Sequence, residues 1–203
     1  MKLKPIALLL PLFFARAAFA QPTADERNPV DLQFAAAVSV SFQGARSDTG
    51  FSAFQPGGRI DATAGALFID SVGLHFGLRS EFFGASAFNG DRSLKGYASV
   101  GPQFSVFYRH RIRETETLVL MSGFQLGTAL LLAKYELIDN RFFYPTFDAA
   151  VFLDVRPMKT KMVTVRVFVP FSAAFRRDVP VCLNGGVGCA LLFDSFLPGT
   201  AQN

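Results

Sequence analysis

The stretch LQFAAAVSVSFQ, residues 32–43, alternates between two kinds of side chain. Its even-numbered positions, from Leu32 and Phe34 to Phe42, are all apolar, whereas its odd-numbered positions are alanine, serine or glutamine. Successive side chains of a β-strand point to opposite faces, so a repeat of two residues predicts an extended strand. An amphipathic helix would instead repeat its apolar residues every three or four positions. The stretch therefore predicts a strand with one apolar face and one small or polar face.

The same alternation returns in seven further segments, each of about ten residues, which is the length that a tilted membrane-spanning strand needs. The last of them is the least regular. Large apolar residues on one face and small or polar residues on the other are typical of a transmembrane barrel. We therefore predict an all-β fold, an eight-stranded antiparallel up-and-down transmembrane β-barrel. The seven segments are 59–68, 72–82, 98–106, 118–132, 143–155, 163–176 and 187–196.

Three other folds compete with this interpretation. A soluble lipocalin-like barrel also has eight strands, but its large apolar residues face inward. With 24 phenylalanines in the chain, that arrangement would overpack one narrow interior. A helical membrane protein is disfavoured because only residues 118–135 approach the required length, and Ser122, Gln125 and Thr128 interrupt them. A soluble β-sandwich is the remaining alternative.

The expected connections alternate in length. Residues 70–71 and 157–162 form short turns, and the charged segment 109–117 is intermediate. Longer links fall at 44–58, 84–96, 133–141 and 177–186. Outer-membrane barrels combine short periplasmic turns with longer outer loops. Because the strand number is even, both termini are expected in the periplasm.

The first twenty residues predict a secretory signal peptide. Lys2 and Lys4 precede an apolar run, and Ala18-Phe19-Ala20 has the pattern of a cleavage site. The mature chain would then be one barrel domain, residues 21–203, located in the bacterial outer membrane. Loss of Lys2, Lys4 and Arg16 would leave a net charge of +1, and this weak charge argues against a nucleic-acid partner.

The whole mature chain resembles the small outer-membrane barrels of the OmpA, OmpX and OmpW type in strand number, loop asymmetry and alternation. Such proteins usually end on an aromatic residue. Here Phe196 takes that place, but residues 197–203 follow it.

Polar residues on the small face should line the barrel lumen. Asp154 and Arg166 are symmetric about the 157–162 turn and should meet across one hairpin. Two interpretations stay open: paired charges that fill a narrow lumen, or a salt-bridge gate in a narrow pore. Because many inward neighbours are glycine, alanine or serine, we expect room for water, which favours the pore. The predicted lumen network comprises His75, Arg79, Glu81, Gln103, Gln125, Asp148, Asp154, Arg166 and Asp194, with Arg59, Asp61 and Arg176 toward the outer end.

We expect no catalytic centre, cofactor or metal site. The two histidines, His75 and His110, lie in no recognisable nucleophile or metal-ligand motif, and the carboxylates are scattered. Cys182 and Cys189 flank the turn-like Asn184-Gly185-Gly186, and export favours a disulfide between them, with two free thiols as the alternative.

The function that we predict is a narrow pore for small solutes or ions. The alternative is a plugged barrel whose outer loops bind a host or envelope partner. The expected partners are outer-membrane lipid, and either small solutes or a surface ligand. Phe51, Phe54, Phe88 and Phe142, in or beside the long links, are candidates for contact with such a ligand.

Overall fold

The structure is a computed structural model, and it describes residues 30–47, 50–68, 71–84, 96–135, 141–157, 163–176 and 181–195. Eight strands account for nearly all of them. Within these residues, no helix is long and apolar enough to cross a membrane. The strands are β1 (Val30–Ser47), β2 (Gly50–Phe68), β3 (Val72–Phe83), β4 (Tyr97–Glu114), β5 (Leu118–Tyr135), β6 (Arg141–Pro157), β7 (Val163–Ala174) and β8 (Cys182–Ser195).

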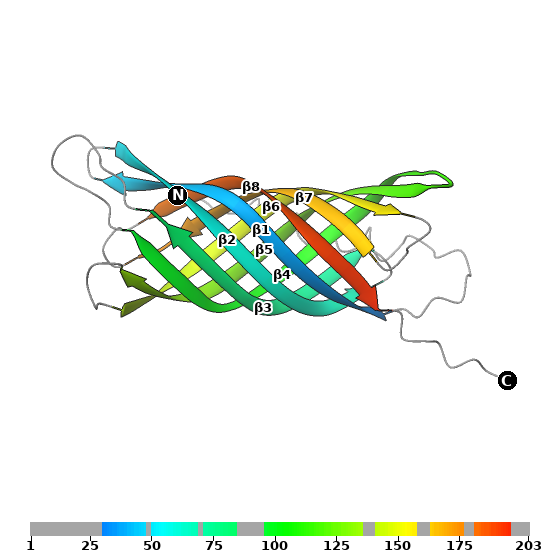
Figure 1. The fold of residues 1–203 in the computed structure, drawn as a ribbon, viewed down its shortest axis with the longest axis horizontal. Helices are drawn as coiled ribbons and strands as arrows, with labels where there is room; N and C mark the ends of the chain where they lie inside the picture. Colours follow the sequence, from blue (N-terminus) through cyan, green and yellow to red (C-terminus); the bar gives the residue numbers. More distant parts are fainter. Residues whose placement is uncertain are drawn as a thin grey trace, which may run out of the picture.

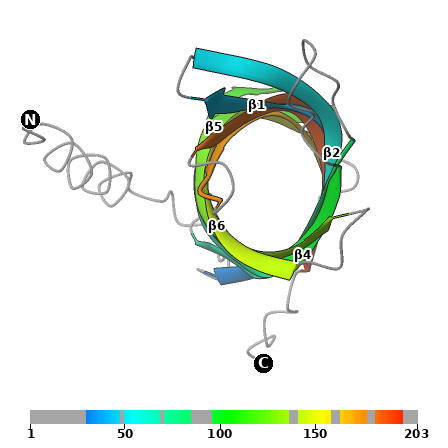
Figure 2. The same ribbon diagram turned by 90° about the vertical axis from the view of Figure 1, so that its left-hand side faces the viewer.

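Each strand pairs antiparallel with the next, and β8 pairs with β1, so the sheet closes into a barrel (Figures 1 and 2). The predicted all-β, eight-stranded up-and-down barrel is confirmed. Val30 and Ser195 lie at the same end, which we call the terminal end. The opposite end, where β1 joins β2 and β3 joins β4, is called the loop end. Closure leaves no unpaired sheet edge along the barrel wall.

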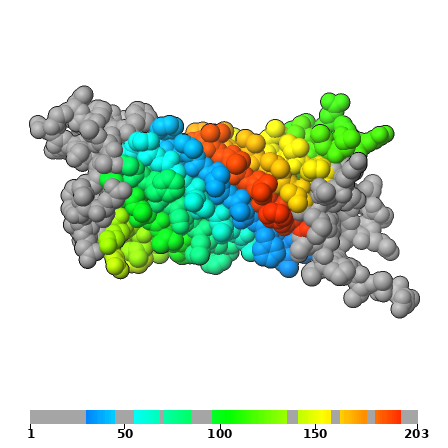
Figure 3. Space-filling view, viewed as in Figure 1, coloured from blue at the N-terminus to red at the C-terminus, as the bar shows by residue number. Residues whose placement is uncertain are grey.

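The alternation of the sequence becomes the two surfaces of the barrel. Phe34 is 52% exposed, and Phe76 and Phe143 are 64% and 67% exposed, whereas their strand neighbours Gln33, His75 and Tyr144 are almost completely buried. All eight strands therefore present large apolar side chains on the outer wall, and most polar residues face the lumen. Figure 3 shows one side of this wall, where β8 lies beside β1. This is the sidedness of a barrel that contacts lipid and the opposite of a soluble lipocalin-like barrel.

Two connections are shorter than the sequence suggested. Strand β4 continues to Glu114 and β5 starts at Leu118, so the expected 109–117 link is mostly a β-ribbon that projects at the terminal end (Figure 1). Arg109, expected in this turn, is inside the lumen and 1% exposed. Strands β1 and β2 likewise absorb most of the expected 44–58 link. Cross-strand pairing holds these polar residues in strands despite their turn-like composition.

The predicted signal peptide, residues 1–20, and the tail after Phe196 lie outside the described residues. The same is true of most of the expected 84–96 link and of the Phe88 predicted within it.

Candidate functional site

The middle of the lumen is occupied by an ion cluster centred on Arg79, which β3 directs inward. Its guanidinium donates to Asp61 at 3.2 Å, to Asp148 at 2.7 Å, to Gln103 at 2.9 Å and to Thr146 at 3.2 Å. Arg59 contacts the same two carboxylates, Asp61 at 2.6 Å and Asp148 at 3.3 Å. Only 2% of Arg79 is exposed. These four charged residues form the central ion cluster, in which each charge has partners of opposite sign.

An aromatic layer lies between this cluster and the loop end. Tyr97 donates to Gln43 at 2.8 Å, and the Tyr144 hydroxyl lies 2.9 Å from Ser99 and 3.3 Å from Glu81. Buried phenols need such partners because an unsatisfied hydroxyl is costly in an apolar place. The guanidinium of Arg176 lies over the Tyr97 ring at 4.4 Å. The loop-end aromatic layer therefore comprises Phe83, Tyr97, Phe142 and Tyr144.

A second aromatic layer lies toward the terminal end. The Arg166 guanidinium lies against two rings that meet edge to face, 4.6 Å from the centroid of Phe107 and 3.6 Å from that of Phe152. It also donates two hydrogen bonds to Asp154, at 2.7 and 2.9 Å, so these residues pair across the β6–β7 hairpin as their positions predicted. Arg109 approaches the same carboxylate at 3.7 Å. This terminal-end aromatic layer comprises Phe107, Phe152 and Phe168, and it is stacked by Arg166.

A hydrogen-bonded chain lines the terminal-end side of the lumen. The Nε2–H of His75 donates to Gln33 Oε1 at 2.8 Å, and Gln33 Nε2 donates to Asp194 at 2.5 Å. Arg156 lies 3.8 Å from the same aspartate. The His75 ring also packs against Phe107, with centroids 5.0 Å apart. The chain joins β3 to β1 and β1 to β8, so it crosses the seam where the barrel closes.

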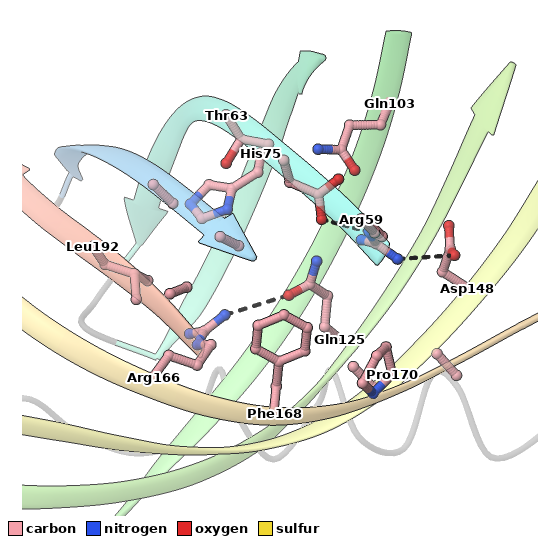
Figure 4. A pocket seen from close by; sticks show the side chains of 16 residues that line it. Arg59, Thr63, His75, Gln103, Gln125, Asp148, Arg166, Phe168, Pro170 and Leu192 are labelled. Atoms are coloured by element: carbon pink, nitrogen blue, oxygen red, sulfur yellow. Dashed lines mark hydrogen bonds and ion pairs between the residues drawn. The ribbon is translucent and has the colours of Figure 1, made fainter. Parts of the chain in front are cut away.

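A cavity of about 50 Å³ remains between the central ion cluster and the terminal-end aromatic layer. Figure 4 shows Arg59 and Asp148 on one side of it, and Arg166 hydrogen-bonded to Gln125 on another. A site for one water needs about 10–15 Å³ by this measure, so the cavity has room for a few waters. A second cavity, near Pro170 and Ser172, measures about 10 Å³.

Four inward glycines accommodate aromatic rings instead of leaving water-filled space. Gly73 pairs directly with Phe107, Gly123 with Phe152, Gly188 with Phe168, and Gly57 with Phe83. A Cβ on any of these glycines would lie 2.1–2.5 Å from a ring atom of its partner. Each ring therefore lies over the bare backbone of the neighbouring strand, an arrangement that protects glycine within a sheet. Three of the small inward residues that favoured a pore, Gly73, Gly123 and Gly188, are thus sites that accept filling side chains.

We expect Gly73→Ala to lower the free energy of unfolding by about 1–3 kcal/mol, because overpacking must displace the Phe107 ring. The three atoms nearest to the added Cβ all belong to that ring, the closest at 2.1 Å. Urea unfolding in lipid vesicles, followed by circular dichroism, measures the change. In a Phe107→Leu background the same substitution should cost less. An equal cost in both backgrounds would show that Gly73 does not act through the ring.

The described inward side chains are balanced in charge. Inside the barrel, six buried or partly buried arginines face six carboxylates. The register adds one further charge of each sign on the same side, the exposed ion pair of Arg111 and Glu114 in the projecting ribbon. A neutral, paired interior offers no excess charge to attract an ion of either sign. The arginines are Arg59, Arg79, Arg109, Arg156, Arg166 and Arg176, and the carboxylates are Asp31, Asp61, Glu81, Asp148, Asp154 and Asp194.

All nine residues of the predicted lumen network face inward, but the structure divides them between separate clusters. Arg79, Glu81, Gln103 and Asp148 lie in or beside the central ion cluster, whereas Gln125, Asp154 and Arg166 lie nearer the terminal end. His75 and Asp194 belong to the chain through Gln33. The sequence analysis placed Gln33 on the inward face but did not include it in the network, and it missed Arg109 and the aromatic layers. The two-residue alternation could have placed Phe107 and Arg109 in the lumen, because both fall on the same face of β4 as the inward Ser105.

The predicted disulfide between Cys182 and Cys189 is wrong, because the two thiols are not bonded to each other. Both residues lie on β8, seven positions apart, so they point to opposite faces: Cys182 is buried in the lumen and Cys189 is exposed on the outer wall. Their separation is about 23 Å at 3.3 Å per residue, whereas a disulfide requires Cα atoms within about 7 Å. The Asn184-Gly185-Gly186 segment pairs with β1 as strand instead of turning. In the described ranges, no three His, Cys, Asp or Glu side chains are grouped to hold a metal ion.

A closed eight-stranded barrel with an apolar outer wall defines the class of small outer-membrane-type barrels. Neisserial surface protein A (NspA) has this fold: its crystal structure matches with a TM-score of 0.50 and 15% identity, covering 83% of this chain and 99% of that one. Ail, the attachment invasion locus protein of Yersinia pestis, aligns over 80% of this chain and 99% of its own, with a TM-score of 0.43 and 9% identity. No protein-family model and no curated protein matches the sequence. The expected resemblance is therefore confirmed for the fold.

Proposed function

We propose that the chain is an integral outer-membrane protein whose barrel is a closed anchor and whose activity is surface interaction through its loop end. The observation that supports this most directly is the filling of the lumen by the central ion cluster and two aromatic layers. A narrow pore, the other function that the sequence suggested, would need these layers to open.

The outer wall supports membrane insertion. Large apolar side chains such as Val40, Leu78 and Phe143 are 59–67% exposed, and in water this surface would drive aggregation. Lipid removes that cost, and a closed barrel satisfies its backbone hydrogen bonds internally. Together with the predicted signal peptide, this supports the outer membrane as the location. The periplasmic placement of the terminal end is part of the proposal.

The lumen contacts support a closed barrel. A permeating ion would have to pass Arg79 within the network of Asp61 and Asp148, and then Arg166 against its two rings. Leaving one partner of a buried ion pair uncompensated costs about 3–5 kcal/mol, and opening the lumen would disturb several such pairs at once. The cavity of about 50 Å³ lies between these layers and has room for only a few waters.

The surface role is supported by where the chain remains available for recognition. With the lumen filled, the connections at the loop end, 84–96, 136–140 and 175–181 together with the β1–β2 hairpin, are the parts that would face outward in this orientation. Loops on a rigid scaffold commonly carry binding residues. The proposal includes no catalytic step, because His75 serves as a hydrogen-bond donor to Gln33 within the filled lumen.

Planar-bilayer recording on the refolded mature chain tests the closed state. Folding is first checked by the gel mobility of unheated and boiled samples. We expect no discrete conductance steps, because the central ion cluster and the two aromatic layers occupy the lumen. Reproducible unitary steps that scale with salt concentration would contradict the closed barrel and favour the narrow pore.

The surface role is tested separately with proteoliposomes on arrays of glycans and serum proteins. Replacing residues 85–95 by a glycine–serine linker should abolish any binding while the heat-dependent mobility shift persists. A matched control replaces the 158–162 turn at the terminal end, where no loss is expected. Binding that survives replacement of every loop-end connection would contradict the proposed role.

A further inference from the structure

We propose that the projecting β4–β5 ribbon carries a binding site for the phosphate group of a membrane phospholipid, formed on its outward face by Arg113, His110 and Ser122. The inference rests on the proposed membrane location. It adds a lipid contact at the terminal end, away from the loop end where surface interaction is proposed. The ribbon is the green projection in Figures 1 and 3.

A β-bulge turns Arg113 to the outward face of the ribbon. The odd-numbered residues of β4 face inward as far as Arg109, which is 1% exposed. The register then shifts between Arg111 and Arg113, so Ile112 is an extra residue and Arg113 pairs with Leu120. Leu120 belongs to the outward set of β5, because both of its neighbours in the strand are buried. Directly paired residues share a face, and a bulge that redirects one side chain in this way recurs beside functional sites.

Three polar side chains lie together on this face. His110 is the outward residue before the bulge, and it pairs with Ser122 in the row next to Arg113. Among the described residues, the side chains of Arg113 and His110 have no hydrogen-bond or ion-pair partner, and both are exposed. The nearby carboxylate of Glu114 is bonded to Arg111 on the other face. A phosphate would accept a charge-assisted hydrogen bond from the guanidinium and further bonds from the imidazole N–H and the hydroxyl.

The site lies at the depth of the lipid headgroups. The outward positions of β4 are apolar or tyrosine from Ala98 to Tyr108, ten residues further on. This is about 23–27 Å along the barrel axis at 3.3 Å per residue and a tilt of 35–45°. The apolar band of such barrels is about 25 Å, so the next outward positions, His110 and Arg113, fall among the headgroups. Tyr108 pairs with Val72, the first residue of β3, so the ribbon leaves the barrel wall at this row.

An apolar surface next to the cation fits the acyl chains. The rings of Tyr108 and Phe124 pack against each other on the outward face, with centroids 5.9 Å apart. Leu153, which is 41% exposed, is the ladder partner of Ser122 on β6. Tyrosine is typical of the membrane interface because its ring is apolar and its hydroxyl is polar. The phosphate would lie on Arg113, and the acyl chains would extend over these apolar side chains.

Native mass spectrometry of the refolded mature chain in detergent measures the binding of phosphatidylglycerol and phosphatidylcholine as probes. We expect phosphatidylglycerol to be retained about 5-fold more tightly, from the attraction of one cation to an anionic lipid. Arg113→Gln should remove this preference, and Arg113→Lys should retain most of it. Arg141→Gln, which changes an exposed arginine near the opposite end of the barrel, is the matched control and should leave the preference unchanged.

A variant of unchanged composition separates a site from general attraction between charges. Arg113→Glu/Glu114→Arg keeps the net charge but places the carboxylate on the outward face and the cation on the inward one. It also breaks the exposed ion pair with Arg111, which should cost little stability. We expect the preference for phosphatidylglycerol to be lost while the heat-dependent gel mobility shift persists. A preference that survives the exchange, or that is absent from the wild-type chain, would overturn the proposal.

Two further measurements separate the possible failures. Inorganic phosphate is added as a competitor, and we expect it to displace the lipid poorly, since it lacks the acyl chains. Displacement at concentrations similar to those of the lipid would show a simple anion site and contradict a lipid site. Flotation with neutral phosphatidylcholine vesicles tests insertion independently. If the protein inserts but shows no difference between the two lipids, the lipid site fails while the proposed location stands; if it does not insert, the location fails.

Discussion

Replacing Arg79 by alanine is expected to lower the free energy of unfolding by about 3–5 kcal/mol, the usual cost of leaving a buried charge network without one partner. Asp61, Asp148 and Glu81 would then face one another with fewer cations, within a lumen where Arg79 is only 2% exposed. Urea unfolding in phospholipid vesicles measures the change. The signal should be circular dichroism, because the chain contains no tryptophan.

Two substitutions serve as controls for this result. Arg79→Lys keeps the positive charge but loses the planar guanidinium that donates to several partners at once. Its free energy of unfolding should therefore fall between those of wild type and Arg79→Ala. Ser80→Ala changes the neighbouring outward position and should stay within about 0.5 kcal/mol of wild type. A loss below about 1 kcal/mol for Arg79→Ala would mean that the central ion cluster contributes little to the folded state.

Asp154→Ala is expected to lower the free energy of unfolding by a similar amount, about 3–5 kcal/mol, because here buried cations lose their anion. Asp154 is the carboxylate shared by Arg166, at 2.7 and 2.9 Å, and Arg109, at 3.7 Å, and its side chain is fully buried. Its removal leaves two guanidinium groups close together without the anion between them. The same vesicle-based unfolding assay applies.

A double-mutant cycle tests whether the effect arises from this ion pair. Once Asp154 is alanine, Arg166→Ala should cost much less than it does in the wild-type chain, because it removes an uncompensated cation. Simple additivity of the two losses would show that the residues act independently. Asn184→Ala, a lumen substitution away from Asp154, is the matched control and should be additive with Asp154→Ala.

Alternation alone predicted the sidedness of the barrel. Residues 32–43 point as expected, with Phe34 outward and Gln33 inward, because a period of two directly determines the face of each side chain. The alternation also places Arg109, Phe107 and Phe152 on the inward face. Arg109 was nevertheless expected in a turn because residues 109–117 are rich in charge, and the two phenylalanines were not predicted to line the lumen. Local composition is a weaker guide than the period where cross-strand pairing continues.

The pairing of rings with glycines was not predictable in the same way. It depends on which residue of one strand lies opposite which residue of the next, as with Gly188 and Phe168. Register across a long connection follows from the closed sheet and not from local sequence. Local sequence was also misleading at Asn184-Gly185-Gly186, whose composition is typical of a turn. In the closed sheet these residues belong to β8 and pair with β1 along the seam.

The hydrogen bond between Gln33 and Asp194 joins the first strand to the last, 161 positions apart. While β8 has yet to meet β1, neither this hydrogen bond nor the backbone ladder along the seam can form, and hydrocarbon would penalise the unpaired backbone groups of both strands. A half-assembled sheet would therefore enter the lipid at a high cost. The order of biogenesis follows: the strands must curl and join at the seam before, or as, the polypeptide crosses the bilayer.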